Sequence, residues 1–274
     1  MQHESIIRLA LFFGVLVLMA AWEAAAPRRT LSVGRGIRWL SNLGLVAVNT
    51  IAVRVAFALG AVGVALVADE RGWGLLNNVD VPHWLAVVLS VIALDFIIYL
   101  QHVMFHAVPT LWRLHMVHHA DRDIDVTTGI RFHTIEILIS LGIKVSAIIL
   151  LGAPAVGVLA FEVLLNATSL FNHSNVRMPT AVDRVLRLFV VTPDMHRVHH
   201  SVIVRETNSN FGFNLPWWDF LMGTYRSQPR DGHEGMEIGL AQFRGDRRTS
   251  WLHWLLVLPF VGDRGNQSID GDRP

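Results

Sequence analysis

The sequence predicts an all-α integral membrane protein with three full spans, an in-membrane helical hairpin and a cytoplasmic helical cap. Three observations support this fold class. Of the 274 residues, 52% are hydrophobic and 16% are charged, which is too apolar for an ordinary soluble domain. Several apolar stretches reach or approach the roughly 20 residues that cross a bilayer. Short histidine-rich boxes lie among and after these stretches, which predicts that the cap carries them.

The apolar stretches give the elements in chain order. They run over about Ser5–Trp22, Trp39–Val67, His83 past Leu100, Thr134–Leu151 and Pro154–Leu170. The first three are predicted to be full spans. The last two are separated only by the turn around Gly152, and so tight a link predicts a helical hairpin within the membrane. A buried hairpin of a soluble domain is the alternative.

The arginines orient the predicted spans. The loop after the first stretch carries Arg28, Arg29, Arg35 and Arg38, whereas the loop after the second carries only Arg71 beside three acidic residues. The positive-inside rule therefore puts the first loop in the cytoplasm. The third span returns the chain to the cytoplasm, so all three histidine boxes are predicted to face it.

The chain is predicted to consist of three parts. Residues 1–82 form N-terminal transmembrane helices, and residues 83–230 contain the histidine boxes and the hairpin. Residues 231–274 form a C-terminal segment, in which Trp251–Phe260 is too short to span and is predicted to lie in the membrane interface. The tail from Gly262 onward is predicted to be disordered. No internal repeat and no second domain are indicated.

The most specific feature is the distribution of the 14 histidines. Ten lie between His102 and His200, and eight of these form three boxes, His102–His106, His115–His119 and His196–His200. Neutral imidazole is the commonest protein metal ligand, and a spacing of i, i+3, i+4 directs the members of a box to one point beside a helix. Ten ligands suit two metal ions rather than one. The chain has no cysteine, so thiolate and soft-metal chemistry is excluded.

Two further histidines flank the hairpin. His133 lies at its start and His173 at its end, and a hairpin brings its ends together, so both are predicted to join the metal site. For either residue alone, a helix-end role would be simpler. Within the hairpin, Lys144 and Glu162 stand at equal distances from the turn and are predicted to pair. Arg54, in the second span, has no partner that the sequence identifies.

The third span carries one polar stripe. Asp95, Tyr99, His102 and His106 are spaced i, i+4, i+7, i+11 and so share one helix face. Asp95 is predicted to accept an N–H from a metal-bound imidazole, which would fix the tautomer of that ring. A structural contact with another helix is the alternative.

The other two boxes follow helix-start signals. Pro109 suits the first turn of a helix that carries the second box. Thr192 as N-cap, Pro193 at the first helical position and Asp194 in the first turn suit a helix that carries the third. Both helices are predicted to face the end of the third span.

The ligand set narrows the chemistry but leaves the metal open, and on affinity alone zinc would displace iron from such a site. A structural zinc ion needs only four ligands, the HExxH motif of zinc proteases is absent, and bis-histidine haem needs pairs deep within a bundle. A two-iron centre that activates O2 fits best. A histidine-rich metal-binding or metal-transport membrane protein is the alternative, although a transporter should place ligands along a path at mid-bilayer.

The boxes HVMFH, HMVHH and HRVHH, in this order, resemble those of the fatty acid hydroxylase/sterol desaturase superfamily of membrane di-iron enzymes. The segments 121–136, 172–175 and 207–225 resemble segments common in its bacterial members. The resemblance covers roughly residues 85–230 and suggests a single-domain, bacterial-type member.

The resemblance implies an oxidoreductase that uses O2 to hydroxylate or desaturate a membrane lipid, such as an acyl chain or a sterol. It implies two iron ions, held by His102, His106, His115, His118, His119, His133, His173, His196, His199 and His200. No cytochrome b5-like domain or nucleotide-binding loop is evident, so a separate ferredoxin, cytochrome or reductase is expected to supply electrons. The expected location is a bacterial cytoplasmic membrane, with the site facing the cytoplasm. The net charge of +1 gives no reason to expect nucleic acid as a partner.

Four side chains are candidates to support the metal-bound histidines: Asp95, Glu136, Asn208 and Asp219. Asn210 belongs to the same stretch after the third box. For the residues of that stretch, turn formation and capping around Gly212 and Pro216 is an equally good interpretation.

Overall fold

The structure is a computed structural model that describes residues 4–261, 263, 265 and 269. The predicted disordered tail therefore lies largely outside the described residues. The long helices are α1 (Glu4–Ala25), α2 (Arg35–Ala56), α3 (Gly60–Glu70), α4 (His83–Ala107), α5 (Pro109–His119), α6 (Thr134–Leu151) and α7 (Ala155–Asn172). The described part of the chain contains no β-strand, only two isolated bridges, Pro27–Val176 and Ser201–Ile238. The prediction of an all-α fold is confirmed.

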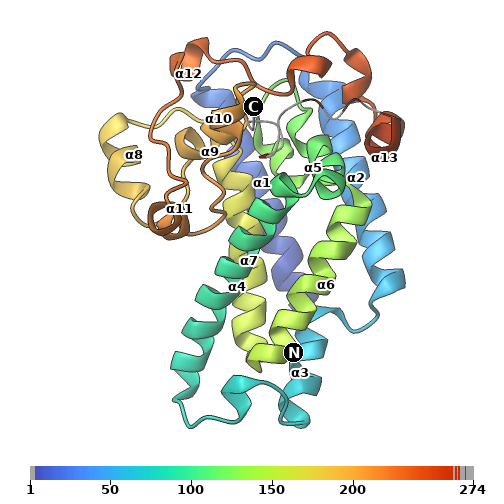
Figure 1. The fold of residues 1–274 in the computed structure, drawn as a ribbon, viewed down its shortest axis with the longest axis vertical. Coiled ribbons are helices and arrows are strands. Elements are labelled where there is room, and N and C mark those ends of the chain that lie inside the picture. The colour runs from blue at the N-terminus through green and yellow to red at the C-terminus, as the bar shows by residue number, and fades with distance from the viewer. Residues whose placement is uncertain (1–3, 262, 264, 266–268, 270–274) are drawn as a thin grey trace.

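Five segments are long and apolar enough to cross a membrane. They are Ile6–Ala25, Arg35–Asn77, His83–Ala107, Thr134–Leu151 and Ala155–Asn172. Figure 1 shows these helices as an elongated bundle that carries the short helices at one end. The bundle thus has the composition and length of a membrane domain, with a cap on one side.

The second predicted span is not one continuous helix. α2 ends at Ala56, Phe57 leaves the helical conformation with φ −138° and ψ 85°, and α3 starts at Gly60. Gly60 has a φ of 64°, a value that residues with a Cβ rarely adopt. The local conformation at residues 57–60 therefore interrupts a stretch whose composition is apolar throughout.

The two helices of the predicted hairpin and their tight link are present. α6 and α7 are joined at Gly152, which caps α6 in the left-handed conformation with φ 64° and ψ 43°. Lys144 pairs with Glu162 across the two helices, as predicted. Arg8 of α1 also reaches Glu162, with 2.6 Å between Nη1 and Oε2, so one buried carboxylate pairs with two cations.

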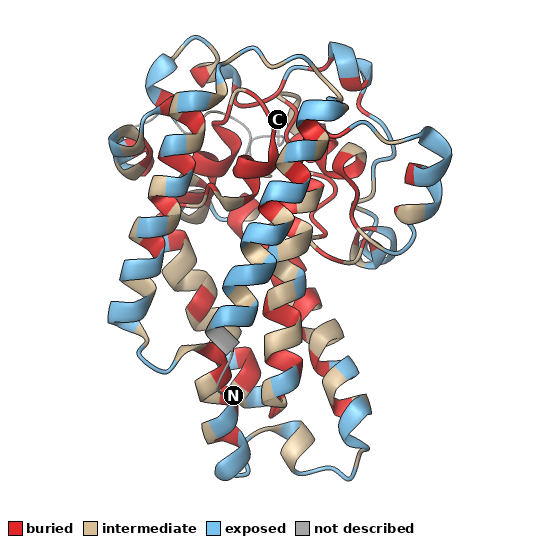
Figure 2. Ribbon diagram, turned by 180° about the vertical axis from the view of Figure 1, so that it is seen from behind, coloured by how far each residue is buried: buried red, intermediate tan, exposed pale blue. Residues whose placement is uncertain are grey.

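The cap consists of short helices and loops around a buried interior. Its helices are α8 (Thr180–Leu186), α9 (Pro193–His199), α10 (Val204–Thr207), α11 (Trp217–Met222), α12 (Gly232–Gly235) and α13 (Leu252–Val261). Its 3-10 turns are η2 (Val126–Ile130), η3 (Ala241–Phe243) and η4 (Arg247–Ser250), while η1 (Leu75–Asn77) lies at the opposite end of the bundle. Figure 2 shows that buried residues concentrate in the cap, whereas the long helices present exposed residues outward. This pattern is expected when lipid covers the helices and protein fills the cap.

The predicted helix starts are present in the cap. Pro109 opens α5, and Thr192 caps α9, its Oγ1 accepting the Met195 N–H at 3.3 Å. The predicted interfacial helix is α13, which packs Leu255 and Leu258 into a cluster with Trp112 of α5. The starts of the two box-bearing helices are thus set by local sequence.

Buried ion pairs hold the loop after α5. Arg38 of α2 is fully buried, and its Nε and Nη2 donate to the two carboxylate oxygens of Asp121 at 2.7 and 2.9 Å. Its Nη1 donates to Asp125 at 2.7 Å. Arg131, also fully buried, donates to the carbonyl of Val117 in α5 at 2.8 Å. These contacts fix the C-terminal end of the helix that carries the second histidine box.

Candidate metal centre

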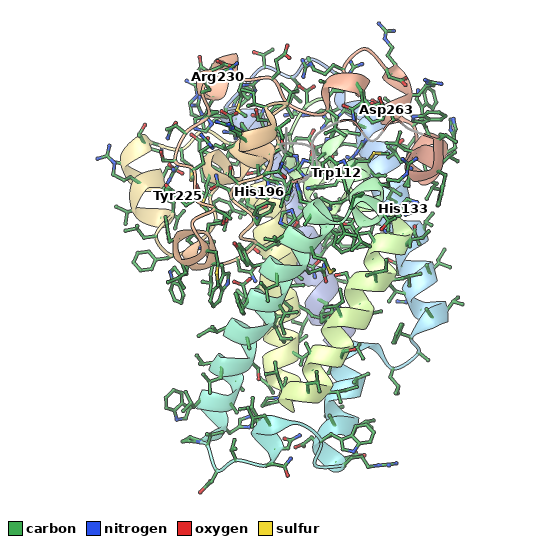
Figure 3. The ribbon with its side chains drawn as sticks, in the orientation of Figure 1. Trp112, His133, His196, Tyr225, Arg230 and Asp263 are labelled. Atoms are coloured by element: carbon green, nitrogen blue, oxygen red, sulfur yellow. The ribbon has the colours of Figure 1, made fainter. Side chains whose placement is uncertain are left out.

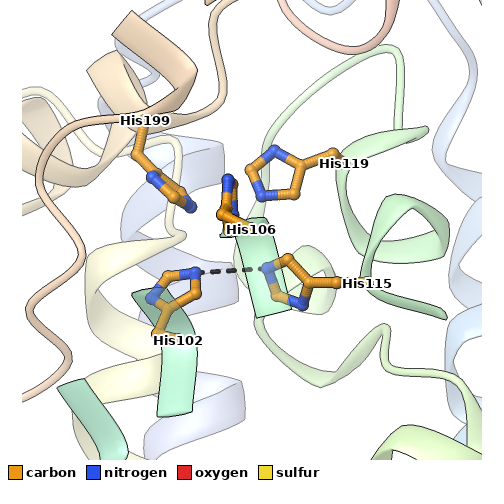
Figure 4. A group of neighbouring side chains, drawn as sticks. All are labelled: His102, His106, His115, His119 and His199. Carbon is orange, nitrogen blue, oxygen red and sulfur yellow. Dashed lines mark hydrogen bonds between the residues drawn. The ribbon is translucent and has the colours of Figure 1, made fainter. Parts of the chain in front are cut away.

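Nine buried histidines form two adjacent clusters in the cap. The first cluster contains His102, His106, His115, His119 and His199, and the second contains His118, His173, His196 and His200. In each cluster, one potential ligand atom per residue lies within 4.8 Å of every other. Figure 4 shows the five rings of the first cluster around one space. The clusters are neighbours, since the ring centroids of His119 and His200 are 4.7 Å apart.

Each HxxHH box divides its histidines between the two clusters. In α5, His115 and His119 join the first cluster and His118 the second. The third box reverses this arrangement, because His196 and His200 join the second cluster and His199 the first. Residues four apart lie on one face of a helix, while the residue between them points to a different side. The expectation that each box aims at a single point is therefore corrected, and the HxxHH spacing builds two neighbouring sites.

Hydrogen bonds to the outer ring nitrogens fix the tautomers of several rings. The Nδ1 atoms of His102, His199 and His173 lie 2.8 Å from the carbonyl oxygens of Phe211, Ser209 and Ser169, respectively. A carbonyl oxygen only accepts, so Nδ1 carries the proton in each ring. In the neutral imidazole, Nε2 is then left with a lone pair. The three rings thus present lone pairs toward the cluster interiors.

Facing lone pairs indicate that the clusters fit a metal ion. The Nε2 atoms of His102 and His115 lie 3.2 Å apart. His173 Nε2 lies 3.1 Å from that of His118 and 3.0 Å from that of His196. For His102 and His115, whose Nδ1 atoms donate to Phe211 and Glu136, the two Nε2 lone pairs repel unless a cation lies between them. A metal ion bound by both nitrogens would remove this repulsion, so the donor set suits a cation.

Unpartnered ring nitrogens support the same conclusion. Seven buried histidine nitrogens of the two clusters have no hydrogen-bond partner among the described residues: Nε2 of His106, His119 and His199, Nδ1 of His118 and His196, and both nitrogens of His200. Buried polar atoms are rarely left without partners, because each costs about 1–3 kcal/mol. Metal coordination would satisfy one nitrogen of each of these rings.

Burial keeps six of the clustered histidines neutral. Burial, and next to it the neighbouring imidazoles, lowers the pKa well below the ordinary value of 6.5 for His118, His119, His196, His199 and His200. Burial also lowers the pKa of His173 to about 3. Only the neutral ring offers a lone pair to a metal ion. These rings are therefore ready to bind metal at physiological pH.

His133 is the one predicted ligand that the structure does not bring to either cluster. It caps the start of α6, where its Nδ1 accepts the N–H of Ile135 at 3.2 Å. Its Nε2 lies 3.2 Å from the carbonyl of Leu256 in α13. Figure 3 shows it at the upper end of α6, apart from His196. The hairpin brings its two ends to the cap, but only His173 points inward.

Of the four side chains predicted to support metal-bound histidines, two contact a histidine of the clusters directly. Glu136 Oε1 accepts from His115 Nδ1 at 2.6 Å, and Asn208 Oδ1 lies 3.1 Å from His106 Nδ1. Such outer contacts orient a metal-binding ring and raise its basicity.

The other two act on the backbone of the loop after the third box. Asp95 contacts no imidazole and instead accepts the N–H groups of Asn214 and Leu215, at 3.3 and 3.2 Å, and the indole N–H of Trp218 at 2.8 Å. This corrects the expected contact and favours the structural alternative. Asp219 accepts the N–H groups of Phe211 and Gly212, each at 2.8 Å.

The loop that these carboxylates hold supplies three of the contacts to histidine Nδ1 atoms. Its contributions are the carbonyls of Ser209 and Phe211 and the Asn208 side chain. Gly212 is required there, because a Cβ at this position would lie 2.7 Å from Asp219 Oδ2. The sequence does not predict the two backbone acceptors, because every residue has a carbonyl group and nothing in the sequence indicates which carbonyl accepts a hydrogen bond from a histidine.

Comparison with known proteins gives consistent similarities. The family model described as fatty acid hydroxylase matches residues 87–224. The chain is 36% identical over 193 residues to the ornithine lipid hydroxylase OlsE of Rhizobium tropici, covering 70% of this chain and 55% of that protein. It is 30% identical over 148 residues to human alkylglycerol monooxygenase, covering 53% of this chain and 31% of that protein.

The alkylglycerol monooxygenase of Xenopus tropicalis is 28% identical over 141 residues, covering 50% of this chain and 30% of that protein. The chain thus matches about half the length of the Rhizobium relative and less than a third of the other two. No solved structure matches the chain.

Proposed function

The chain belongs to the fatty acid hydroxylase family, and we propose that it is an O2-dependent membrane di-iron enzyme that hydroxylates a lipid. The observation that carries this proposal is the pair of buried histidine clusters, in which seven ring nitrogens have no hydrogen-bond partner among the described residues. Hydroxylation is favoured over desaturation because the relatives compared above are named hydroxylase or monooxygenase. The name of the Rhizobium relative favours an ornithine lipid, or a lipid with a similar polar headgroup, as the substrate.

The nine clustered histidines would hold two iron ions, the first cluster with five rings and the second with four. When bound, iron supplies the activation of O2 and the oxidation of a C–H bond. The protein would orient the ligand rings and keep water from the site. Glu136 and the loop carbonyls hold proton positions on the outer ring nitrogens, and the buried cap excludes water from the site. Electrons would come from a separate donor.

The membrane arrangement extends this proposal. We propose that α1, the α2–α3 segment and α4 are the three full spans, and that α6 and α7 dip into the membrane as a hairpin. The arginines of the loop after α1 support a cytoplasmic cap. Residues 83–230 would then be the catalytic region, while α13 lies in the interface.

Metal content and oxygen consumption test the proposal together. Protein purified without oxygen should contain about two iron ions per chain. Given a reductant and bacterial lipid extract, it should consume O2 and yield a lipid heavier by one oxygen atom in mass spectrometry. A single zinc ion, or no metal, together with metal flux into vesicles would contradict the enzyme and support a metal transporter.

A lipid-facing groove gives a further prediction. An open apolar groove of about 630 Å³ lies between Ile97 of α4 and the face of α6 from Ile139 to Leu151. It runs for about 18 Å along α6, so it can hold part of an acyl chain. Phe in place of Gly142 should fill it, because a Cβ there meets no atom within 4 Å. Turnover of long-chain lipids should fall by about tenfold, and that of short-chain lipids less.

The matched control for Gly142→Phe is Gly14→Phe in α1, where a Cβ likewise meets nothing within 4 Å. Lipids of graded chain length in detergent micelles would give the comparison. Equal loss at all chain lengths in the Gly142 variant would show that the groove does not hold the chain.

A further inference from the structure

One short helix of the cap lies at the depth of a membrane span. Asp95 is at the middle of α4, twelve residues from His83 and twelve from Ala107, or about 18 Å from either end. Its carboxylate binds Trp218 of α11 and the backbone immediately before that helix. The rings of Phe96 and Trp218 also pack at 4.7 Å between centroids. α11 is therefore fixed beside the centre of α4 rather than at its end.

The thickness of a bilayer places this contact below the membrane surface. A hydrocarbon core of about 30 Å takes about 20 helical residues. Counted from His83, where α4 begins, the core ends near His102. Asp95 lies seven residues earlier, so the start of α11 would lie about 10 Å inside the hydrocarbon boundary. Thr224, just after α11, lies 3.0 Å from the Tyr99 hydroxyl, so the end of α11 would lie about 5 Å inside it. Figure 1 shows α11 beside the bundle and below α9 and α10.

The outer surface at this place is apolar. Eight large hydrophobic residues of α8, α11 and the turn after α8 are exposed by 40% to 72%: Val182, Val185, Leu188, Phe189, Trp217, Phe220, Leu221 and Met222. The indole N–H of Trp217 donates to the carbonyl of Leu188 at 2.9 Å, which joins the two segments into one surface. So large an apolar patch is rarely left to water.

The charges around this surface favour lipid as its partner. Within residues 180–226, the exposed charged side chains are all arginines, Arg184, Arg205 and Arg226. The acids Asp183 and Asp219 are buried and face the protein. Arg184 lies on α8 itself, and an apolar surface that carries an exposed arginine is typical of helices that lie in a membrane interface, because guanidinium groups bind phosphate.

We propose that α8 and α11 form a shoulder of the cap that is embedded in the adjacent leaflet, with α11 among the acyl chains. This placement rests on packing and depth and does not require the enzymatic activity. It has a consequence for the site, since His102 lies only seven residues beyond Asp95 on α4. The first histidine cluster would then lie level with the boundary between acyl chains and headgroups, where a lipid can reach it without leaving the bilayer.

Spin labelling tests the shoulder directly, because the chain has no cysteine and each introduced cysteine is its only thiol. Leu221→Cys, with Met222→Cys as a second site, would carry a nitroxide in protein reconstituted into phosphatidylcholine/phosphatidylglycerol vesicles. Leu150→Cys on α6 is the membrane reference, and Gln228→Cys is the aqueous reference. Electron paramagnetic resonance would compare collision rates with O2, which concentrates in lipid, and with a water-soluble nickel chelate.

The labels at Leu221 and Met222 should resemble the label at Leu150, with high O2 and low nickel accessibility. Nickel accessibility equal to that at Gln228 would place α11 in water and overturn the proposal. Protection from both reagents, with dipolar broadening between labels, would also overturn it and identify the surface as an interface between copies of the chain. None of these readings depends on whether the protein is active.

Discussion

Replacing His199 with Ala is expected to remove iron from the first cluster and abolish turnover. His199 belongs to that cluster, where its Nε2 has no protein partner and its Nδ1 is held by Ser209. Loss of only an outer partner of a metal ligand typically costs 10–100-fold in affinity or activity. Loss of the ligand itself should therefore lower turnover by more than about 100-fold. Iron per chain, measured by mass spectrometry of the purified protein, should fall from two to one or fewer.

The matched control is His133→Asn. His133 is buried in the same cap, but both of its ring nitrogens have protein partners and it lies in neither cluster. Asn can keep the cap at the start of α6, so this variant should retain two iron ions and most of its turnover. If His133→Asn lost iron while His199→Ala kept it, the division of the histidines proposed above would be wrong.

Replacing Arg38 with Met is expected to cause the largest loss of stability. The change leaves Asp121 and Asp125 buried without their main cation. Burial raises the pKa of Asp121, but the charges of Arg38 and Arg131 outweigh it and hold that pKa at about 2. Removing one partner of a buried ion pair typically costs 3–5 kcal/mol. The free energy of unfolding in detergent, measured by chemical denaturation, should fall by about that amount.

Two further variants test whether the loss of stability comes from the broken ion pairs or from the loss of an arginine in general. Arg54→Met lies on the same helix, and among the described residues no ion pair involves Arg54, which is exposed. Its free energy of unfolding should not fall, because no buried carboxylate loses its cation and a charge within a membrane-spanning segment is itself costly. Arg38→Lys keeps the charge but cannot bind Asp121 with two parallel N–H groups, so an intermediate loss is expected. Equal stability of Arg38→Met and the unmodified protein would show that the pairs are not structural.

Local sequence predicted much of the fold. The apolar stretches give the five candidate spans, Gly152 ends α6, and Pro109 and Thr192 start the box-bearing helices. The pairing of Lys144 with Glu162 followed from equal distances to a turn. Each of these features depends on residues close together in the chain, for which helical spacing and capping rules are sufficient.

Other features depended on contacts between distant segments. The break between α2 and α3 occurs within an apolar stretch that gives no composition signal. Asp95 meets a loop about 120 residues later instead of an imidazole. Arg38 meets Asp121 across a sequence separation of 83 residues. Hydropathy and helical periodicity contain no information on such partners.

The histidines show the same division. The sequence by itself determined the class of protein, the histidine boxes and the helix face on which each ring lies. Only the tertiary structure decided that two HxxHH boxes divide in opposite senses between two clusters, that His173 joins them, and that His133 does not. The physical reason is that spacing along one helix fixes the direction of a side chain relative to that helix. Which rings share a metal is fixed by how α4, α5, α7 and α9 pack, and that packing is set by non-local contacts.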